Sequence, residues 1–182
     1  MARVPYVTRE DLPPEQRRLY DDISQGRGHV SAPFKALLNS PEACAVVSAL
    51  GQYVRFKSTL PAPLRELAIL TVAREINCQY EWTYHEPLAR QAGVSDAAIE
   101  ALRYRRPLKG LPLDEAAVTR YARSLVRAHQ AGDALFRALQ KRLGTRDMVN
   151  LTVTVGYYTL LGLSMKALEV ELEPGMEPLL PV

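Results

Sequence analysis

One uncharged segment, from Met148 to Met165, strongly limits the folds that this chain can adopt. It approaches the length of a membrane span, but two glycines and several hydroxyl and amide side chains interrupt its apolar residues. We therefore predict a helix that is buried in a protein core or a subunit interface. Residues 151–155 alternate in a pattern that is typical of strands. Because no other segment offers a strand partner, we predict that they are helical as well.

Composition places the chain among soluble globular proteins. Its 182 residues, 47% hydrophobic and 24% charged, are enough to bury a core. We predict one domain over residues 1–182, in which residues 1–39 form an extension made of an arm, a short helix and, at residues 29–39, an apolar loop that packs on the body or covers a pocket. The net charge of +3 is small and both signs are interspersed, which argues against a nucleic-acid partner.

The cysteines and the N-terminus indicate a cellular compartment. Cys44 and Cys78 do not make a disulfide framework, and the first residues contain no apolar signal core. We therefore expect a cytoplasmic protein with no membrane partner. Cys44 lies beside the apolar stripe of a predicted helix, so we expect it to act as a small core hydrophobe.

Helix start and stop signals divide the chain after the extension. Ser40–Pro41 and Ser95–Asp96 are typical helix starts, Gly93 is a typical helix end, and Asn77 and Asp114 are candidate N-caps. We predict an all-α bundle of about seven helices, built around a helical hairpin, with boundaries near 41–54, 63–76, 78–92, 96–102, 114–130, 133–143 and 146–170. The tail from residue 174 carries several prolines, so we expect it to be irregular.

The candidate functional residues lie between Glu66 and His85. Cys78, Glu81 and His85 stand at i, i+3 and i+7, so on one helix they share a narrow stripe. Along a continuous helix Glu66 would be about 18 Å from Cys78. A turn at residues 76–77 would instead fold the two helices back on each other and bring Glu66 level with His85.

Such a cluster suits proton transfer. A histidine can both donate and accept a proton, and a carboxylate partner would fix the tautomer of His85. Two carboxylates in one half-buried pocket push their pKa values apart, so that one donates and the other accepts. Cys78 near a helix N-terminus would favour the thiolate, which the neighbouring Glu81 opposes.

Structural interpretations of the same residues stay open. Glu81 and His85 also form an i, i+4 pair, which on an exposed helix face is ordinary solvated helix support. We expect Tyr80, Trp82 and Tyr84 to serve packing rather than substrate contact. One histidine with mixed ligands matches common zinc sites poorly, so we predict neither a metal nor a cofactor. The remaining histidines, His29 and His129, are predicted to be structural or on the surface.

The spacing Glu66-x11-Cys78-x2-Glu81-x3-His85, followed by Ala89 and Gly93-Val-Ser-Asp, resembles the carboxymuconolactone decarboxylase and alkylhydroperoxidase D superfamily. The resemblance is strongest over residues 60–102, and a weaker similarity covers residues 146–168. It implies an all-helical subunit, assembly into trimers or hexamers, and a site near a subunit interface. That arrangement would also account for the uncharged helix at 148–165.

The superfamily has two branches with different chemistry, a peroxidase branch and a decarboxylase branch. In the peroxidase branch two cysteines form a C-x-x-C motif, and a glutamate and a histidine relay protons to their thiols. Cys78, Glu66 and His85 match three of these positions, but Glu81 replaces the second cysteine, so a disulfide between these two positions cannot form. A one-cysteine cycle through a sulfenic acid remains an alternative.

The decarboxylase branch works with acid–base residues. We therefore predict an enzyme that acts on a small carboxylated molecule, with His85 as acid and base and Glu66 and Glu81 beside it. Peroxidase activity of Cys78 and a non-catalytic helical oligomer are the alternatives. Candidate cations for a substrate carboxylate are Arg55, Lys57 and Arg74.

Overall fold

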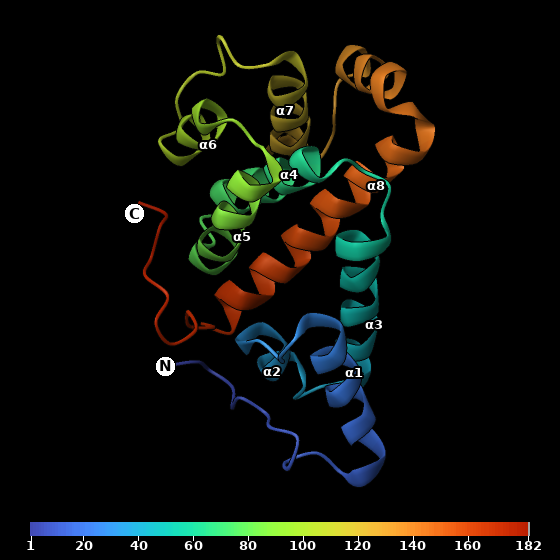
Figure 1. The fold of residues 1–182 in the computed structure, drawn as a ribbon, viewed down its shortest axis with the longest axis vertical. Helices are drawn as coiled ribbons and strands as arrows, with labels where there is room; N and C mark the ends of the chain where they lie inside the picture. The colour runs from blue at the N-terminus through green and yellow to red at the C-terminus, as the bar shows by residue number, and fades with distance from the viewer. Residues whose placement is uncertain (182) are drawn as a thin grey trace.

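The structure, a computed structural model, describes residues 1–181. Over these residues the chain is helical and has no strand, which confirms the predicted all-α class (Figure 1). The elements are a 3-10 helix at Pro14–Gln16, α1 (Arg17–Arg27), α2 (Ala32–Leu37), α3 (Pro41–Gln52), a π-helix at Tyr53–Lys57, α4 (Ala62–Glu75), α5 (Gln79–Ala92), α6 (Asp96–Arg103), α7 (Leu113–Ala128) and α8 (Asp133–Ala167).

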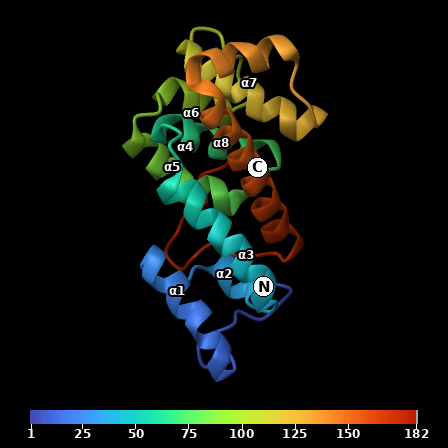
Figure 2. The same cartoon turned by 90° about the vertical axis from the view of Figure 1, so that its right-hand side faces the viewer.

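The long helix α8 runs diagonally through the molecule, with α4–α7 at one end and α1–α3 at the other (Figures 1 and 2). Residues 151–155 are helical within it, as predicted. The hydroxyls of Thr152 and Thr154 donate to the carbonyls of Met148 and Asn150, at 2.8 and 2.7 Å. Backbone acceptors of the helix thus satisfy these threonines, and their β-branched pattern does not need a neighbouring strand.

By length and composition α8 could cross a membrane, but 56% of its apolar window is buried inside the protein. That burial is typical of the core helix of a soluble protein. The two helices predicted for 133–143 and 146–170 follow one another within α8, and they meet at Gly144. Gly144 has φ 78° and ψ 165°, a conformation that glycine adopts without steric cost.

The prediction of a loop over residues 29–39 is wrong, because α2 forms there. Ser31 and Pro33 provide a start signal, and the amide of Lys35 donates to the carbonyl of Ser31 at 3.0 Å. Phe34 packs into a small N-terminal apolar cluster with Leu12, Ile23, Val30, Leu38 and Cys44. Cys44 is fully buried, which confirms its predicted place in a core.

Two predicted N-caps are also wrong. Pro112 precedes α7, and Asp114 lies in its first turn, where it forms an ion pair with Arg142. Between α4 and α5 the chain turns where the hairpin requires it, but the N-cap of α5 is Cys78. Asn77 adopts φ 51°, a left-handed conformation that asparagine tolerates well, and its side chain accepts hydrogen bonds from Arg74 and Arg105.

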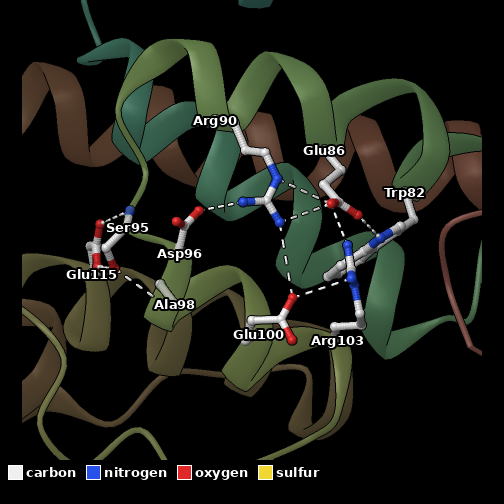
Figure 3. A network of polar contacts seen from close by, with 9 residues as sticks. All are labelled: Trp82, Glu86, Arg90, Ser95, Asp96, Ala98, Glu100, Arg103 and Glu115. Atoms are coloured by element: carbon white, nitrogen blue, oxygen red, sulfur yellow. Dashed lines mark hydrogen bonds and ion pairs between the residues drawn. The ribbon is translucent and has the colours of Figure 1, made fainter.

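A polar network holds α6 against α5 (Figure 3). Its centre is the buried carboxylate of Glu86, which accepts from the indole of Trp82 at 2.7 Å and from the guanidinium groups of Arg90 and Arg103. The predicted start and end signals at Ser95 and Gly93 are confirmed, since the Ser95 hydroxyl accepts from the amide of Ala98 at 3.1 Å and Gly93 has φ 92°. This network fixes the helix that carries His85.

The C-terminal tail fastens the N-terminal extension to the hairpin. It leaves α8 and passes along α5, and residues 177–181 contain no helix, in line with the predicted irregular tail (Figure 1). The carboxylate of Glu173 accepts from the amide of Ala32 at 2.7 Å and from the hydroxyl of Tyr80 at 2.8 Å. Farther along, Leu180 is buried in the main core.

Candidate functional site

Glu66 and His85 face each other across the hairpin of α4 and α5. The Nδ1 atom of His85 lies 2.7 Å from the Oε2 atom of Glu66, although 19 positions separate the two residues in sequence. Both side chains are buried, at 2% exposed for His85 and 5% for Glu66. The turn at residues 76–77 therefore brings these two groups level, as the spacing predicts.

The charge of Glu66 fixes which atom carries the shared proton. Burial alone would raise the pKa of Glu66, but the hydrogen bond and charge of His85, together with Arg65 and Arg55, hold it below its usual value. An ionised carboxylate can only accept, so Nδ1 of His85 donates to it. The other ring nitrogen, Nε2, is thereby left for a second partner.

Glu81 is that second partner. Its Oε2 atom lies 3.4 Å from Nε2 of His85, one helical turn away on α5. Glu81 is 4% exposed, which excludes the interpretation of this pair as solvated helix support. The imidazole thus lies between two buried carboxylates.

His85 and Glu81 line a small pocket that is partly open to solvent. Glu66 is not among the lining residues and reaches the pocket only through His85. The other walls come from the N-terminal extension, the π-helix and α8, which provide Phe34, Arg55 and Tyr158 among others. Residues of the extension therefore line the pocket, although α2 and not a loop provides part of this wall.

Aromatic rings surround His85 in this pocket. The ring of Tyr158 meets the imidazole edge to face, with centroids 5.0 Å apart, and the ring of Tyr84 lies 5.3 Å away. Trp82 packs in the core as predicted, but Tyr80 and Tyr84 also line the pocket. Positions 80, 81, 84 and 85 fall on one side of α5, so these tyrosines flank the two proton-handling groups.

Cys78 does not join the site. It is 2% exposed and is not among the residues that line the pocket. Because it is the N-cap of α5, with ψ 99°, its side chain leaves the stripe that a helical residue would follow. Burial and the charge of Glu81 raise the pKa of its thiol to about 12, against the weaker opposing effects of the Glu81 amide and Lys166.

Of the three candidate cations for a substrate carboxylate, only Arg55 lines the pocket. Lys57 is exposed, and Arg74 lies beside the C-terminal tail, where it donates to the carbonyl of Pro181. His129 at the end of α7 and His29 are both exposed, in line with the prediction, and His29 also lines the pocket.

The contribution of α8 to the pocket does not follow from the sequence pattern. Tyr157, Tyr158 and Leu161, which follow His85 by more than 70 positions in sequence, reach the pocket from α8. The one signal in the sequence was the weaker family similarity over residues 146–168, which indicated a helix but did not indicate which of its residues line a pocket. No group of three or more histidine, cysteine and acidic side chains in the described residues could hold a metal ion.

Known proteins are similar to this chain both in sequence, over part of its length, and in fold. Residues 41–123 match the model of the carboxymuconolactone decarboxylase family. No curated protein matches the sequence. A crystal structure of an alkylhydroperoxidase AhpD core, a peroxidase-related protein from Ralstonia eutropha JMP134, is 18% identical, with a TM-score of 0.78 over 95% of this chain and 93% of that one.

Two further structures are similar to the chain. A peroxidase-related protein from Silicibacter sp. TM1040 is 19% identical, with a TM-score of 0.72 over 97% of this chain and 90% of its own. The debrominase Bmp8 is 13% identical, with a TM-score of 0.68 over 94% of this chain and 92% of its own. At such identities these likenesses establish the fold.

Proposed function

We propose that this chain, in which residues 41–123 match the model of the carboxymuconolactone decarboxylase family, is an enzyme that performs acid–base chemistry on a small carboxylated molecule. The reaction is a decarboxylation or a related lyase or isomerase step. One observation carries this proposal: the imidazole of His85 lies between two buried carboxylates and lines a pocket. A histidine held between carboxylates in a pocket is typical of a proton-transfer site.

The decarboxylation step assigns a role to each group. As the bond from the substrate carbon to its carboxylate breaks, CO2 leaves and the electron pair stays on the carbon as an enolate. Protonated His85 donates its Nε2 proton to that carbon, and Glu81 lies where it can return a proton to the ring. Glu66 holds Nδ1 and stabilises the imidazolium between turnovers.

CO2 release from carboxymuconolactone, and from a panel of other unsaturated and β-keto acids, tests the proposal. We expect His85→Ala to lower turnover by about 100-fold or more, the usual contribution of a positioned acid or base. His129→Ala removes an exposed histidine outside the pocket and should leave the rate unchanged. A His85→Ala protein that works at the wild-type rate would refute the proposal.

Thiol-dependent peroxidase activity is the second candidate, because two of the similar structures are of peroxidase-related proteins. The buried thiol of Cys78, with its raised pKa, speaks against it, since the thiolate is the attacking species. Peroxide consumption with dithiothreitol as reductant decides between the two. Loss of that consumption in Cys78→Ser would favour the peroxidase, whereas equal rates would exclude it.

We also propose that the enzyme is a cytoplasmic homo-oligomer, a trimer or a hexamer. Two free cysteines are compatible with a reducing compartment. Apolar side chains on the outer face of α8 support self-association, since Val149, Leu160 and Leu163 are 56%, 47% and 52% exposed. A non-catalytic oligomer is the third alternative; the wild type would then show no turnover, and Glu66→Gln would leave assembly unchanged.

A further inference from the structure

Arg55 carries a charge in the pocket that no carboxylate of the described residues neutralises by direct contact. Other half-buried arginines in the molecule have such partners: Arg65 lies 3.4 Å from Glu66, and Arg123 lies 2.8 Å from Glu75. No carboxylate in residues 1–181 forms an ion pair with Arg55, whose guanidinium instead lies over the rings of Phe56 and Tyr84, at 5.2 and 5.4 Å. Such a group is suited to receive an anion.

The guanidinium stays charged in this environment. Burial lowers the pKa of Arg55, but the phenol groups of Tyr158 and Tyr84 and the carboxylate of Glu66 outweigh that effect and raise it overall. Glu66 acts only from a distance, since its own oxygens already contact His85 and Arg65. The positive charge is therefore available to a ligand.

The fold holds Arg55 in place through a local distortion. Residues 53–57 form a π-helix, and such turns are frequent at functional sites. Val54 is buried on one side of Arg55, and the hydroxyl of Tyr53 donates to the side-chain oxygen of Asn150 on α8 at 2.8 Å. These contacts anchor the turn to the central helix and direct Arg55 into the pocket.

One aromatic ring separates this charge from the proton-handling group. The centroid of Tyr84 lies 5.4 Å from the guanidinium carbon of Arg55 and 5.3 Å from the imidazole of His85. The remaining walls carry the rings of Phe34, Tyr80 and Tyr158. Rings of this kind favour flat, π-bonded ligands, which can pack against them face to face or edge to face.

We propose that Arg55 is the anion-binding residue of this site and that it selects a compact, planar ligand with an anchoring carboxylate on an unsaturated ring, separate from any carboxylate that leaves as CO2. The carboxylate accepts two hydrogen bonds from the guanidinium, and the ring lies along Tyr84 toward His85. This inference rests on the proposed function, whose substrate it narrows from any small carboxylated molecule to a flat one.

Equilibrium binding tests this assignment without catalysis. Titration calorimetry with benzoate, benzamide and cyclohexanecarboxylate separates the contribution of charge from that of planarity. We expect benzoate to bind at one site per chain, benzamide to bind at least about tenfold more weakly, and cyclohexanecarboxylate to be weaker than benzoate by several-fold. Equal affinity for benzoate and benzamide, or no saturable binding of benzoate, would overturn the proposal.

Matched variants assign the charge to one residue. We expect Arg55→Gln to weaken benzoate binding by at least about tenfold, and Lys57→Gln, an exposed cation on the same π-helix, to leave it unchanged. Arg55→Lys keeps the charge but loses the planar guanidinium, which donates two hydrogen bonds to one carboxylate, so we expect it to bind benzoate with intermediate affinity. This variant serves as the test if Arg55→Gln does not fold. Wild-type affinity in both arginine variants would contradict the assignment.

The same titration separates this proposal from the proposed function. Because His85 does not contact the carboxylate in this arrangement, His85→Ala should still bind benzoate with an affinity close to that of the wild type. If His85→Ala retains full turnover while Arg55→Gln loses benzoate, the acid–base function fails and the anion site stands. If benzoate binds independently of Arg55 while His85→Ala is inactive, only the anion site fails.

Discussion

At the scale of single residues, the pairing of Glu66 with His85 makes stability depend on pH. The pKa of Glu66 is lowered in the folded protein, so the unfolded chain takes up a proton first as the pH falls. The stability from this carboxylate is therefore present above about pH 4.5 and is lost as the pH falls below that value. Urea unfolding between pH 3 and 7 should show a smaller acid-induced loss in Glu66→Gln than in the wild type. If the stability of Glu66→Gln and of the wild type falls in parallel as the pH is lowered, this prediction is wrong.

Cys78 gives a second prediction at this scale. Its thiol pKa is raised from 9.0 to about 12, which lowers the thiolate fraction near neutral pH by about a thousandfold. In a Cys44→Ser background, iodoacetamide at pH 8 should alkylate Cys78 slowly in the native protein and rapidly in urea. Because the raised pKa belongs to the folded state, the stability that this group contributes is complete below pH 9 and is lost as the pH rises toward 12. Equal alkylation rates in both states would show that the thiol is open.

Sequence spacing was sufficient for some site residues and insufficient for others. Glu66, Glu81 and His85 could be placed together because helical periodicity and one turn determine their positions. Cys78 could not, because a single change from helical to N-cap backbone redirects its side chain. Tyr158 could not either, since its approach to His85 depends on how two distant helices pack.

At the scale of elements, the C-terminal tail stabilises the extension that lines part of the pocket. Glu173 is the acceptor for both the amide of Ala32 and the hydroxyl of Tyr80. We expect Glu173→Ala to lower the free energy of unfolding by about 1–3 kcal/mol, because two donors lose their acceptor. Urea unfolding measures this change.

Glu171 is the matched control in the same tail. Its carboxylate pairs with the N-terminal amine at 3.2 Å in an exposed position, and solvent screens such pairs so that they add little stability. Glu171→Ala should therefore have the smaller effect. A Glu173→Ala protein as stable as Glu171→Ala would show that the tail does not hold the extension.

Most elements could be predicted because their ends carry strong local signals, as at Ser95 and Gly93. Two elements could not. The short helix α2 depends on packing of Phe34 into the N-terminal cluster, and the π-helix at residues 53–57 depends on anchoring by Tyr53 to α8. Both are set by tertiary contacts, which override local propensity.

At the scale of the whole molecule, the outer face of α8 predicts self-association. Leu160 and Leu163 expose about half of their side chains on a helix face without a partner in the described chain, and burying them favours a second copy. Sedimentation velocity should detect a trimer or hexamer in the wild type and a smaller species in Leu163→Lys. Leu113→Lys, at a 77% exposed leucine on α7, is the control that should assemble normally. A wild-type protein that is monomeric at all concentrations would contradict this prediction.

Also at this scale, the fold class followed from the uncharged segment at 148–165 together with the helix signals before it. The path of α8 through the molecule did not, because its burial depends on which helices pack around it (Figure 2). That packing brings residues of α8 to the hairpin and completes the pocket.

Chemical rescue of His85→Ala measures the central claim most directly. An imidazole added to the solution can replace a missing proton donor, but it cannot repair a misfolded pocket. We predict that CO2 release by His85→Ala is about 100-fold or more below the wild-type rate and rises with imidazole concentration, while Cys78→Ser stays near the wild-type rate. Full activity of His85→Ala without imidazole, together with loss of activity in Cys78→Ser, would contradict the account.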